Sequence, residues 1–171
     1  MHNQNNLSMP RWIQNWLKIT TVICILDVGY TMLRPYTLRG NTLGKIYELW
    51  NIYGDVDLRY ATTSDIVTMA TGRLMIIEII LNIIALYLCR DYPRHAKLTT
   101  FLTSAFVFWK TLLYITMFIF PPKGSVNYMA ESANIWKRIF IFWIPNSIWF
   151  FVPLAVMANL WNNLVDPKTY F

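Results

Sequence analysis

Four long apolar blocks constrain this chain more than any other feature of its sequence. They cover residues 12–33, 66–89, 98–120 and 138–160. Each block has 22 to 24 residues, which as an α-helix is roughly 33–36 Å long and sufficient to cross a bilayer with some tilt. A helix bonds its own backbone polar groups inside lipid, where water is absent. The blocks therefore predict an all-α, polytopic membrane protein, a bundle of four transmembrane helices forming one domain over residues 1–171.

The composition agrees with a membrane protein. Hydrophobic residues make up 56% of the chain and charged residues 14%, whereas a soluble domain has roughly 25% charged residues. The first ten residues are polar and Asp27 interrupts the first block, so we expect a retained helix rather than a cleaved signal peptide. The net charge is +6, but no Lys/Arg-rich run indicates a nucleic-acid partner. Membrane lipid is the expected surrounding of the chain.

The four predicted spans place both termini on one side of the membrane. Lys and Arg are divided almost evenly between the two sides, so counting them does not decide the orientation. The compact cluster of Arg90, Arg94 and Lys97 favours cytosolic termini.

The connection between the first two blocks is long and contains further structure. Residues 43–53 predict a short amphipathic helix, with Ile46, Leu49, Trp50 and Tyr53 on one face. Such a helix lies against the membrane or caps the bundle. The segment 54–57 ends it, and residues 62–65 offer N-cap candidates for the second span.

The sequence offers little material for metal or thiol chemistry. Cys24 and Cys89 lie in or beside apolar blocks, and His2 and His95 lie outside them. This pattern argues against a disulfide framework, a zinc site and a histidine-based triad. No cofactor is expected.

Charged residues inside the predicted spans are the main functional signal. They are Asp27, Arg73, Glu78 and Lys110. A charge at the centre of a membrane helix costs roughly 2.5–3.5 kcal/mol on insertion scales, so it usually faces the bundle interior and has a function. Arg73 lies nearer the surface, where its long side chain can snorkel to water.

Several polar side chains are predicted to reach one chamber. Counting from the side of the first and third connections, Asp27, Asn146, Lys110, Trp149 and Glu78 lie roughly 9–18 Å deep at 1.5 Å per residue. These depths predict a shared cavity between that surface and the membrane centre.

Helical spacing adds two residues to the predicted chamber. Thr71, Glu78 and Asn82 share one helical face at spacings of seven and four. A mostly apolar, aromatic-lined cavity with a few polar groups suits a hydrophobic small molecule.

Each of these residues also has a structural interpretation. Glu78 and Lys110 can be a buried ion pair that joins the second and third spans. Trp149 can be core packing, and Asn82 and Asn146 can be hydrogen-bonding contacts between helices. The carboxyl in the first span is harder to explain structurally, because no basic residue of its own span lies on the same face.

Three motifs give the chain a resemblance to a known family. Residues 50–60 read WNIYGDVDLRY, similar to the pattern W-x-x-Y…D-x-R-Y; residues 146–149 read NSIW and precede Pro153; and Asp27 precedes Leu-Arg-Pro at 33–35. Over about residues 17–164 the chain resembles the EXPERA family, which includes emopamil-binding protein (the sterol Δ8-Δ7 isomerase) and the sigma-2 receptor.

The resemblance implies a four-helix core around an intramembrane cavity in the endoplasmic reticulum, open to sterol-like or cationic amphiphilic ligands. In the isomerase, carboxylic acids add and remove a proton, and a tryptophan stabilises the carbocation. This implies Asp27 and Glu78 as acid and base, with Asp57 supporting or participating. Trp149 would stabilise the cation, and Asn146 would orient the substrate or a carboxyl.

The chain also departs from the isomerase pattern. Thr71 stands where the isomerase has its glutamate, Glu78 lies two turns deeper, and Lys110 is unexpected. We therefore expect a specialised isomerase or cyclase for a sterol- or terpenoid-like substrate, with Lys110, Thr71 and Asn82 among its substrate-binding residues. The alternative is a non-catalytic binding protein like the sigma-2 receptor, in which a carboxylate pairs with a ligand ammonium. A homodimer is compatible with the sequence, although no motif indicates one.

Overall fold

A computed structural model describes residues 8–165, and this part of the chain is helical without a β-strand. Its long helices are α1 (Arg11–Met32), α4 (Ile66–Leu88), α5 (Pro93–Thr116) and α7 (Ile144–Val165). The short elements are α2 (Glu48–Gly54), α3 (Leu58–Ala61), α6 (Ile135–Lys137) and the π-helix η2 (Arg138–Trp143). The predicted all-α class is confirmed for the described residues.

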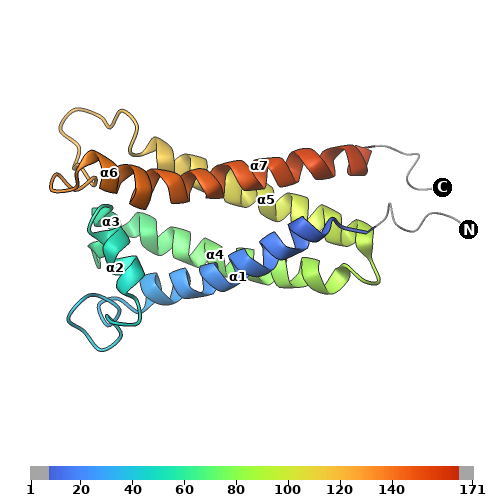
Figure 1. Ribbon diagram of the computed structural model, residues 1–171, viewed down its shortest axis with the longest axis horizontal. Helices are drawn as coiled ribbons and strands as arrows, with labels where there is room; N and C mark the ends of the chain where they lie inside the picture. The colour runs from blue at the N-terminus through green and yellow to red at the C-terminus, as the bar shows by residue number, and fades with distance from the viewer. Residues whose placement is uncertain (1–7, 166–171) are drawn as a thin grey trace, which may run out of the picture.

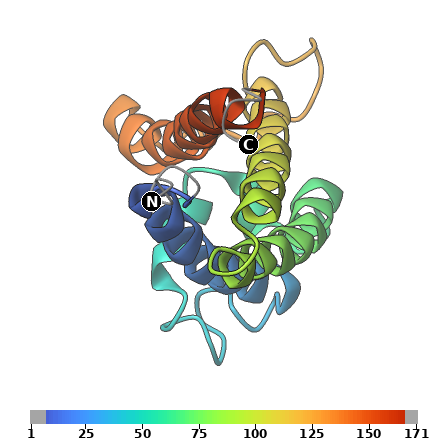
Figure 2. The ribbon, with the colours of Figure 1, turned by 90° about the vertical axis from the view of Figure 1, so that its right-hand side faces the viewer.

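The long helices run along the length of the molecule, and α2 and α3 gather at one end (Figure 1). Helix α1 packs on α4, α4 on α5, and α5 on α7. Helices α1 and α7 make few close backbone contacts, so the series is open between its first and last members. Figure 2 shows the helices from the end of the molecule that lies opposite α2 and α3.

Among the described residues, three helices are long and apolar enough to cross a membrane: Ile66–Leu88, Pro93–Thr116 and the continuous Ile135–Val165. These correspond to three of the four predicted spans. Helix α1 has the length, but it falls short in hydropathy, because Gln14, Asn15 and Lys18 lie in its first half. The prediction of four strongly apolar spans is therefore confirmed only in part.

The ends of α5 differ from the predicted span of residues 98–120. Pro93 starts the helix instead of ending the previous one, because the first helical position needs no backbone N–H donor. The helix ends at Thr116. Phe120 then has a φ of 54°, a left-handed backbone conformation that an α-helix cannot contain.

The last span is longer than predicted and contains a π-helical turn. Asn134 caps its start by accepting a hydrogen bond from the Lys137 backbone N–H at 2.9 Å. The wider turn of η2 directly precedes Pro145. Proline lacks a backbone N–H and crowds the preceding turn of an α-helix, so a local change of helix geometry at this point has a clear cause.

The helix predicted over residues 43–53 starts later in the structure. Residues 43–47 form turns, and the helix begins only at Glu48. The buried Asn51 side chain donates to the backbone carbonyls of Thr37 at 3.1 Å and Gly44 at 3.2 Å. These bonds satisfy loop carbonyls that helix continuation would otherwise use, and they hold the loop against α2. The predicted cap role of Asp65 is confirmed, since it accepts from the Thr68 N–H at 2.8 Å.

An arginine joins three segments at this end of the molecule. Arg34 follows α1 and donates to the carbonyl of Tyr60 at 3.1 Å, to that of Thr62 at 2.6 Å, and to the hydroxyl of Thr68 at 2.9 Å. It therefore fixes α3 and the start of α4 relative to α1.

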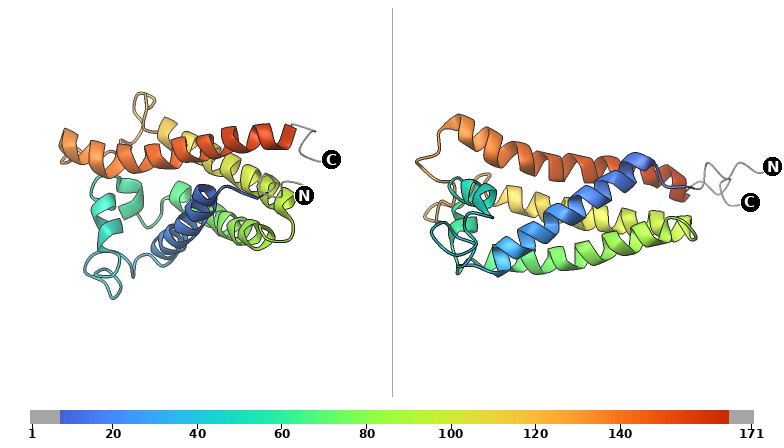
Figure 3. Two further views of the ribbon diagram at one scale, coloured as in Figure 1. Left: turned by 45° about the vertical axis from the view of Figure 1, so that its right-hand side comes forward. Right: turned by 60° about the horizontal axis from the view of Figure 1, so that its bottom comes forward.

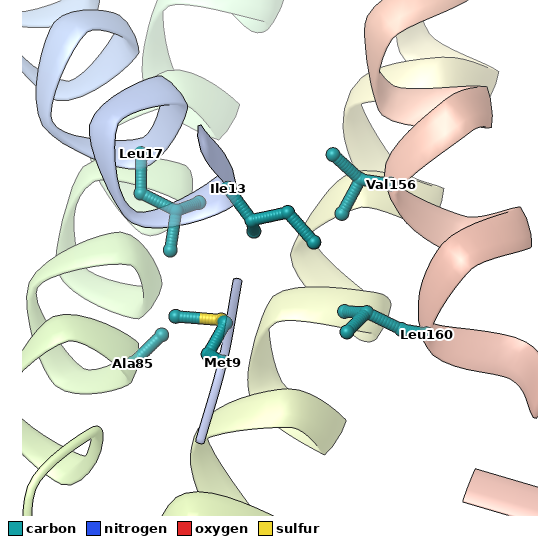
Figure 4. Close-up of a cluster of buried hydrophobic side chains, with 6 residues drawn as sticks. All are labelled: Met9, Ile13, Leu17, Ala85, Val156 and Leu160. Atoms are coloured by element: carbon teal, nitrogen blue, oxygen red, sulfur yellow. The ribbon is translucent and has the colours of Figure 1, made fainter. Parts of the chain in front are cut away.

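A hydrophobic cluster joins α1 to α7 at the end of the molecule opposite α2 and α3. Its members are Met9, Ile13, Leu17, Ala85, Val156 and Leu160 (Figure 4). Figure 3 shows α1 beside α7 at this end and diverging from it toward α2 and α3. The divergence leaves room for a pocket between α1 and α7, next to the short helices α2 and α3.

Candidate functional site

A pocket of about 410 Å³ lies between the diverging helices α1 and α7, and α2 and α3 cover one end of it. Its volume is within the range of small-molecule sites, roughly 300–1,000 Å³. Five aromatic side chains from four elements form much of its wall: Trp50, Tyr53, Tyr60, Tyr114 and Trp149. Of the two positions expected for the short helix of the first connection, against the membrane or capping the bundle, this one agrees with the second.

Five of the eight predicted site residues line this pocket: Asp27, Thr71, Lys110, Asn146 and Trp149. They come from α1, α4, α5 and α7. Four of the five residues that the depth argument grouped are therefore at the pocket, and the fifth, Glu78, is not among its lining residues. The other three predicted residues, Asp57, Glu78 and Asn82, are buried outside the pocket wall.

Asp27 is the carboxylate that the pocket presents directly. Its Oδ1 accepts a hydrogen bond from the Trp50 indole N–H at 2.9 Å, and its Oδ2 accepts one from the Tyr60 hydroxyl at 3.1 Å. Both donors come from the short helices at one end of the pocket, Trp50 from α2 and Tyr60 from α3. The carboxyl group is therefore held in one orientation by neutral donors, and no salt bridge to it is present among the described residues.

Glu78 has a different environment. Its Oε2 lies 2.6 Å from the Lys110 ammonium, and its Oε1 accepts from the Cys24 thiol at 3.3 Å. The Glu78 side chain is 4% exposed and the Lys110 side chain 15%, so this is a buried ion pair between α4 and α5. Of the two interpretations that the sequence left open, the structure contains the ion pair. The role of Glu78 as an acid stays a prediction.

Asp57 is fully buried at the start of α3. It caps α3 by accepting from the Arg59 N–H at 3.1 Å, and it also accepts from the hydroxyls of Tyr114 and Tyr53. Burial raises the pKa of Asp57 to about 6, although these hydrogen bonds act in the opposite direction. Asp57 can thus meet a ligand only through the two tyrosines that separate it from the pocket.

The amide of Asn146 connects α7 to the cap. It donates to the Tyr53 hydroxyl at 3.0 Å and to the Phe142 carbonyl at 2.8 Å. Trp149, one turn further along α7, packs edge-on against Trp16 of α1, with ring centroids 5.6 Å apart. Trp149 therefore lines the pocket and also closes it on the side of the hydrophobic cluster.

The other two predicted polar residues have local partners. The Thr71 hydroxyl donates to the Thr68 carbonyl at 3.2 Å, which leaves its oxygen free to accept. Asn82 donates to the Thr20 hydroxyl at 3.5 Å, and its buried Oδ1 has no hydrogen-bond partner within residues 8–165. Asn82 thus lies in the contact between α1 and α4, which agrees with its interpretation as a hydrogen-bonding contact between helices.

Sequence reasoning missed four aromatic residues of the site. Trp50, Tyr53 and Tyr60 belong to the WNIYGDVDLRY motif, so the signal for them was present in the residues that carried the resemblance. Tyr114 had no such signal, because it is one of many aromatic residues in the third apolar block. Burial raises the pKa of Tyr53 and of Tyr60 well above the ordinary value, so both hydroxyls stay protonated as donors.

The described residues contain no group of three or more His, Cys, Asp or Glu side chains placed to hold a metal ion. Cys24 and Cys89 are both free thiols. His2 lies outside the described residues.

The sequence matches no protein-family model and no solved structure. It is similar to an isomeliandiol synthase of Melia azedarach, with 21% identity over 94% of this chain and 73% of the relative. An isomeliandiol synthase of Ailanthus altissima is 24% identical over 87% of this chain and 68% of its own length. A protoglabretal synthase of Citrus sinensis is 24% identical over 93% of this chain and 72% of its own length. The similarity of this chain to curated synthases therefore extends over nearly all of its length.

Proposed function

We propose that this chain is a membrane isomerase or cyclase of the EXPERA type that acts on a sterol- or terpenoid-like polycyclic substrate. The observation that carries the proposal is the Asp27 carboxyl, oriented by Trp50 and Tyr60 inside an aromatic pocket. The similarity to isomeliandiol and protoglabretal synthases supports an enzyme of terpenoid metabolism. The multi-pass topology, the endoplasmic reticulum and a homodimer belong to the same proposal.

The proposed reaction begins with proton transfer to a double bond. Neutral Asp27 donates its proton to one alkene carbon, which forms a C–H bond and leaves a positive charge on the neighbouring carbon. A buried carboxyl is suited to this step because burial favours its neutral form. Loss of a proton from another carbon then gives a shifted double bond, and no proton is consumed overall.

The pocket wall suits the carbocation between these steps. The ring of Trp149 and the neighbouring tyrosine rings attract positive charge through their π faces. An apolar wall also excludes water that would capture the cation. Lys110 and Thr71 bring hydrogen-bonding groups to the same wall, where they bind an oxygen function of the substrate. Asn146 holds Tyr53 and so fixes the wall around the ligand.

The test is turnover in deuterated water. Microsomes that contain the chain are incubated with a panel of polycyclic alkenes of sterol and terpenoid type, and the products are analysed by mass spectrometry. The expected product is an isomer with one deuterium at the protonated carbon, formed by the original chain and absent with Asp27→Asn. If the panel yields neither an isomer nor deuterium incorporation with the original chain, the proposed function is wrong.

A second candidate is a non-catalytic receptor for cationic amphiphiles. It is favoured by the same Asp27, because a carboxylate surrounded by aromatic rings is also a site for an ammonium group. In that case a radiolabelled amphiphilic amine binds the original chain and fails to bind Asp27→Asn. Amine binding without turnover of any alkene in the panel would favour the receptor over the enzyme.

A further inference from the structure

A proton-shift reaction needs a group that donates a proton and a group that accepts one. Asp27 accounts for one of them in the proposed function. The predicted second acid, Glu78, is bound to Lys110 at 2.6 Å and lies outside the pocket wall. The second proton-handling group must therefore be sought among the other side chains that line the pocket.

Tyr114 has the required position and connection. It comes from α5, lines the pocket, and donates its hydroxyl hydrogen bond to Asp57. Asp57 itself is fully buried and does not reach the pocket. The pair thus forms a path from the pocket, through one phenol oxygen, to a carboxylate that no ligand can touch.

We infer that Tyr114 accepts the proton that leaves the substrate and that Asp57, behind it, takes the phenolic proton. This inference rests on the proposed function and adds the second half of its proton transfer. Tyr114 is the catalytic residue of this step, because it meets the substrate. Asp57 acts through Tyr114 and is a positioning and relay residue.

The step balances in atoms and charge. A C–H bond next to the carbocation breaks, its electron pair forms the new double bond, and its proton moves to the Tyr114 oxygen. The Tyr114 O–H bond breaks at the same time, and that proton moves to the Asp57 carboxylate. The phenol is restored, Asp57 is neutral, and Asp27 is ionised. Exchange with water between turnovers returns one proton to Asp27 and removes one from Asp57.

The chemistry of the acceptor matches the task. A carbon–hydrogen bond beside a carbocation is very acidic, so a weak base such as a phenol oxygen suffices when a carboxylate can take the displaced proton. Asp57 also accepts from Tyr53 and from the Arg59 N–H. These additional donors hold the carboxylate in place while its charge changes.

The first test replaces the hydroxyl and keeps the ring. Tyr114→Phe should lower kcat for the isomerisation at least about 100-fold, the usual contribution of a positioned acid or base. Its remaining products should show deprotonation at a different carbon or addition of water, with deuterium still at the carbon protonated by Asp27. Tyr30→Phe is the matched control, since Tyr30 is buried and hydrogen-bonded to Asn51 but lies outside the pocket wall.

A second variant guards against a loss of folding in Tyr114→Phe. Asp57→Asn keeps an oxygen that caps α3 and accepts from the tyrosine, because asparagine is an equally good N-cap. It cannot take a proton at neutral pH, so kcat should again fall at least about 100-fold. Substrate binding should change little, because Asp57 does not line the pocket.

The outcomes separate this inference from the proposed function. No turnover by the original chain contradicts the proposed function itself. Turnover by the original chain, with the same rate and the same product from both Tyr114→Phe and Asp57→Asn, leaves the isomerase in place and overturns the relay.

Discussion

At the scale of single residues, the three carboxyl groups predicted to be catalytic differ in their partners. Asp27 is held by an indole and a phenol, Glu78 by an ammonium and a thiol, and Asp57 by two phenols and a backbone N–H. A carboxylate with a cationic partner is stabilised in its charged form, whereas one with neutral partners changes its charge more readily. These partners support the proposed assignment, in which Asp27 and Asp57 transfer protons and Glu78 holds Lys110.

Replacing Asp27 by asparagine tests this assignment. The amide keeps the size of the side chain and removes the proton, so we expect kcat for the isomerisation to fall about 10²–10⁴-fold. The thermal midpoint in detergent should change far less than the activity. Activity equal to that of the original chain would show that the proton comes from another group.

The ion pair can be tested by removing its partners separately and together. Lys110→Met leaves the Glu78 charge buried without a cation and should lower the free energy of unfolding by about 3–5 kcal/mol. The double variant Glu78→Gln/Lys110→Met removes both charges and should recover much of this loss. Thermal unfolding in detergent measures both effects. If the double variant is no more stable than Lys110→Met, the two side chains are not coupled as a pair.

The titration of Asp57 predicts opposite effects of pH on stability and activity. Burial raises its pKa from 3.8 to about 6, so the folded state binds the proton more tightly than the unfolded state does. Stability from this group is therefore present at pH 4 and is lost as the pH rises through 6, by about 3 kcal/mol for a shift of this size. The relay needs ionised Asp57, so its contribution to activity, measured as the ratio of kcat for the original chain to kcat for Asp57→Asn, should rise over the same interval. The groups that face it are Tyr53 from α2, Arg59 from α3 and Tyr114 from α5.

Paired pH series on the original chain and on Asp57→Asn check this prediction. The difference between their thermal midpoints should change sharply between pH 4.5 and pH 6.5, expected from a pKa of about 6. A difference that stays constant over this interval would show that Asp57 does not titrate there.

At the scale of helices, the approach of α1 to α4 positions Asp27. The two helices are in tight contact at Gly72, where an added Cβ would lie 2.5 Å from Met32 Cε and 2.8 Å from Thr31 Oγ1. Thr31 is one helical turn after Asp27. A side chain at position 72 must therefore displace the side chains of Met32 and Thr31, and a large one pushes this end of α1 away from α4.

Gly72→Leu should lower the free energy of unfolding by about 1–3 kcal/mol through overpacking. It should also lower activity, because the Asp27 carboxyl moves relative to its donors on α2 and α3. Ala70→Leu is the control, since Ala70 is exposed on the same helix. Equal thermal midpoints and activities for the two variants would contradict a tight α1–α4 contact at Gly72.

The helices were also the part of the fold that sequence patterns predicted best. Long apolar runs specify α4, α5 and α7, and a charge inside such a run is rare enough to mark Asp27 and Lys110. Tyr114 was out of reach, since its importance comes from a contact with Asp57, 57 positions earlier. Helix ends were less predictable, because Pro93 permits a helix start as readily as it ends a helix.

At the scale of the whole molecule, the membrane crossings of the chain can be counted by experiment. Within residues 8–165, three helices are apolar enough to cross a membrane, and α1 is not among them. If α1 also crosses, the two ends of the chain lie on one side. Epitope tags at both ends should then be equally accessible to protease in intact microsomes. A tag in the exposed segment 123–127 between α5 and α6 should show the opposite accessibility. Ends on opposite sides would show that α1 does not cross.

The open edge between α1 and α7 determines how the concentration of a substrate must be expressed. These helices meet at the hydrophobic cluster and diverge beside the pocket. A ligand that enters there comes from the surrounding lipid, so the rate depends on its mole fraction among the lipids and not on its molarity in the buffer. Adding inert phospholipid at a fixed amount of substrate and protein should therefore slow the reaction, because the substrate is then diluted within the membrane.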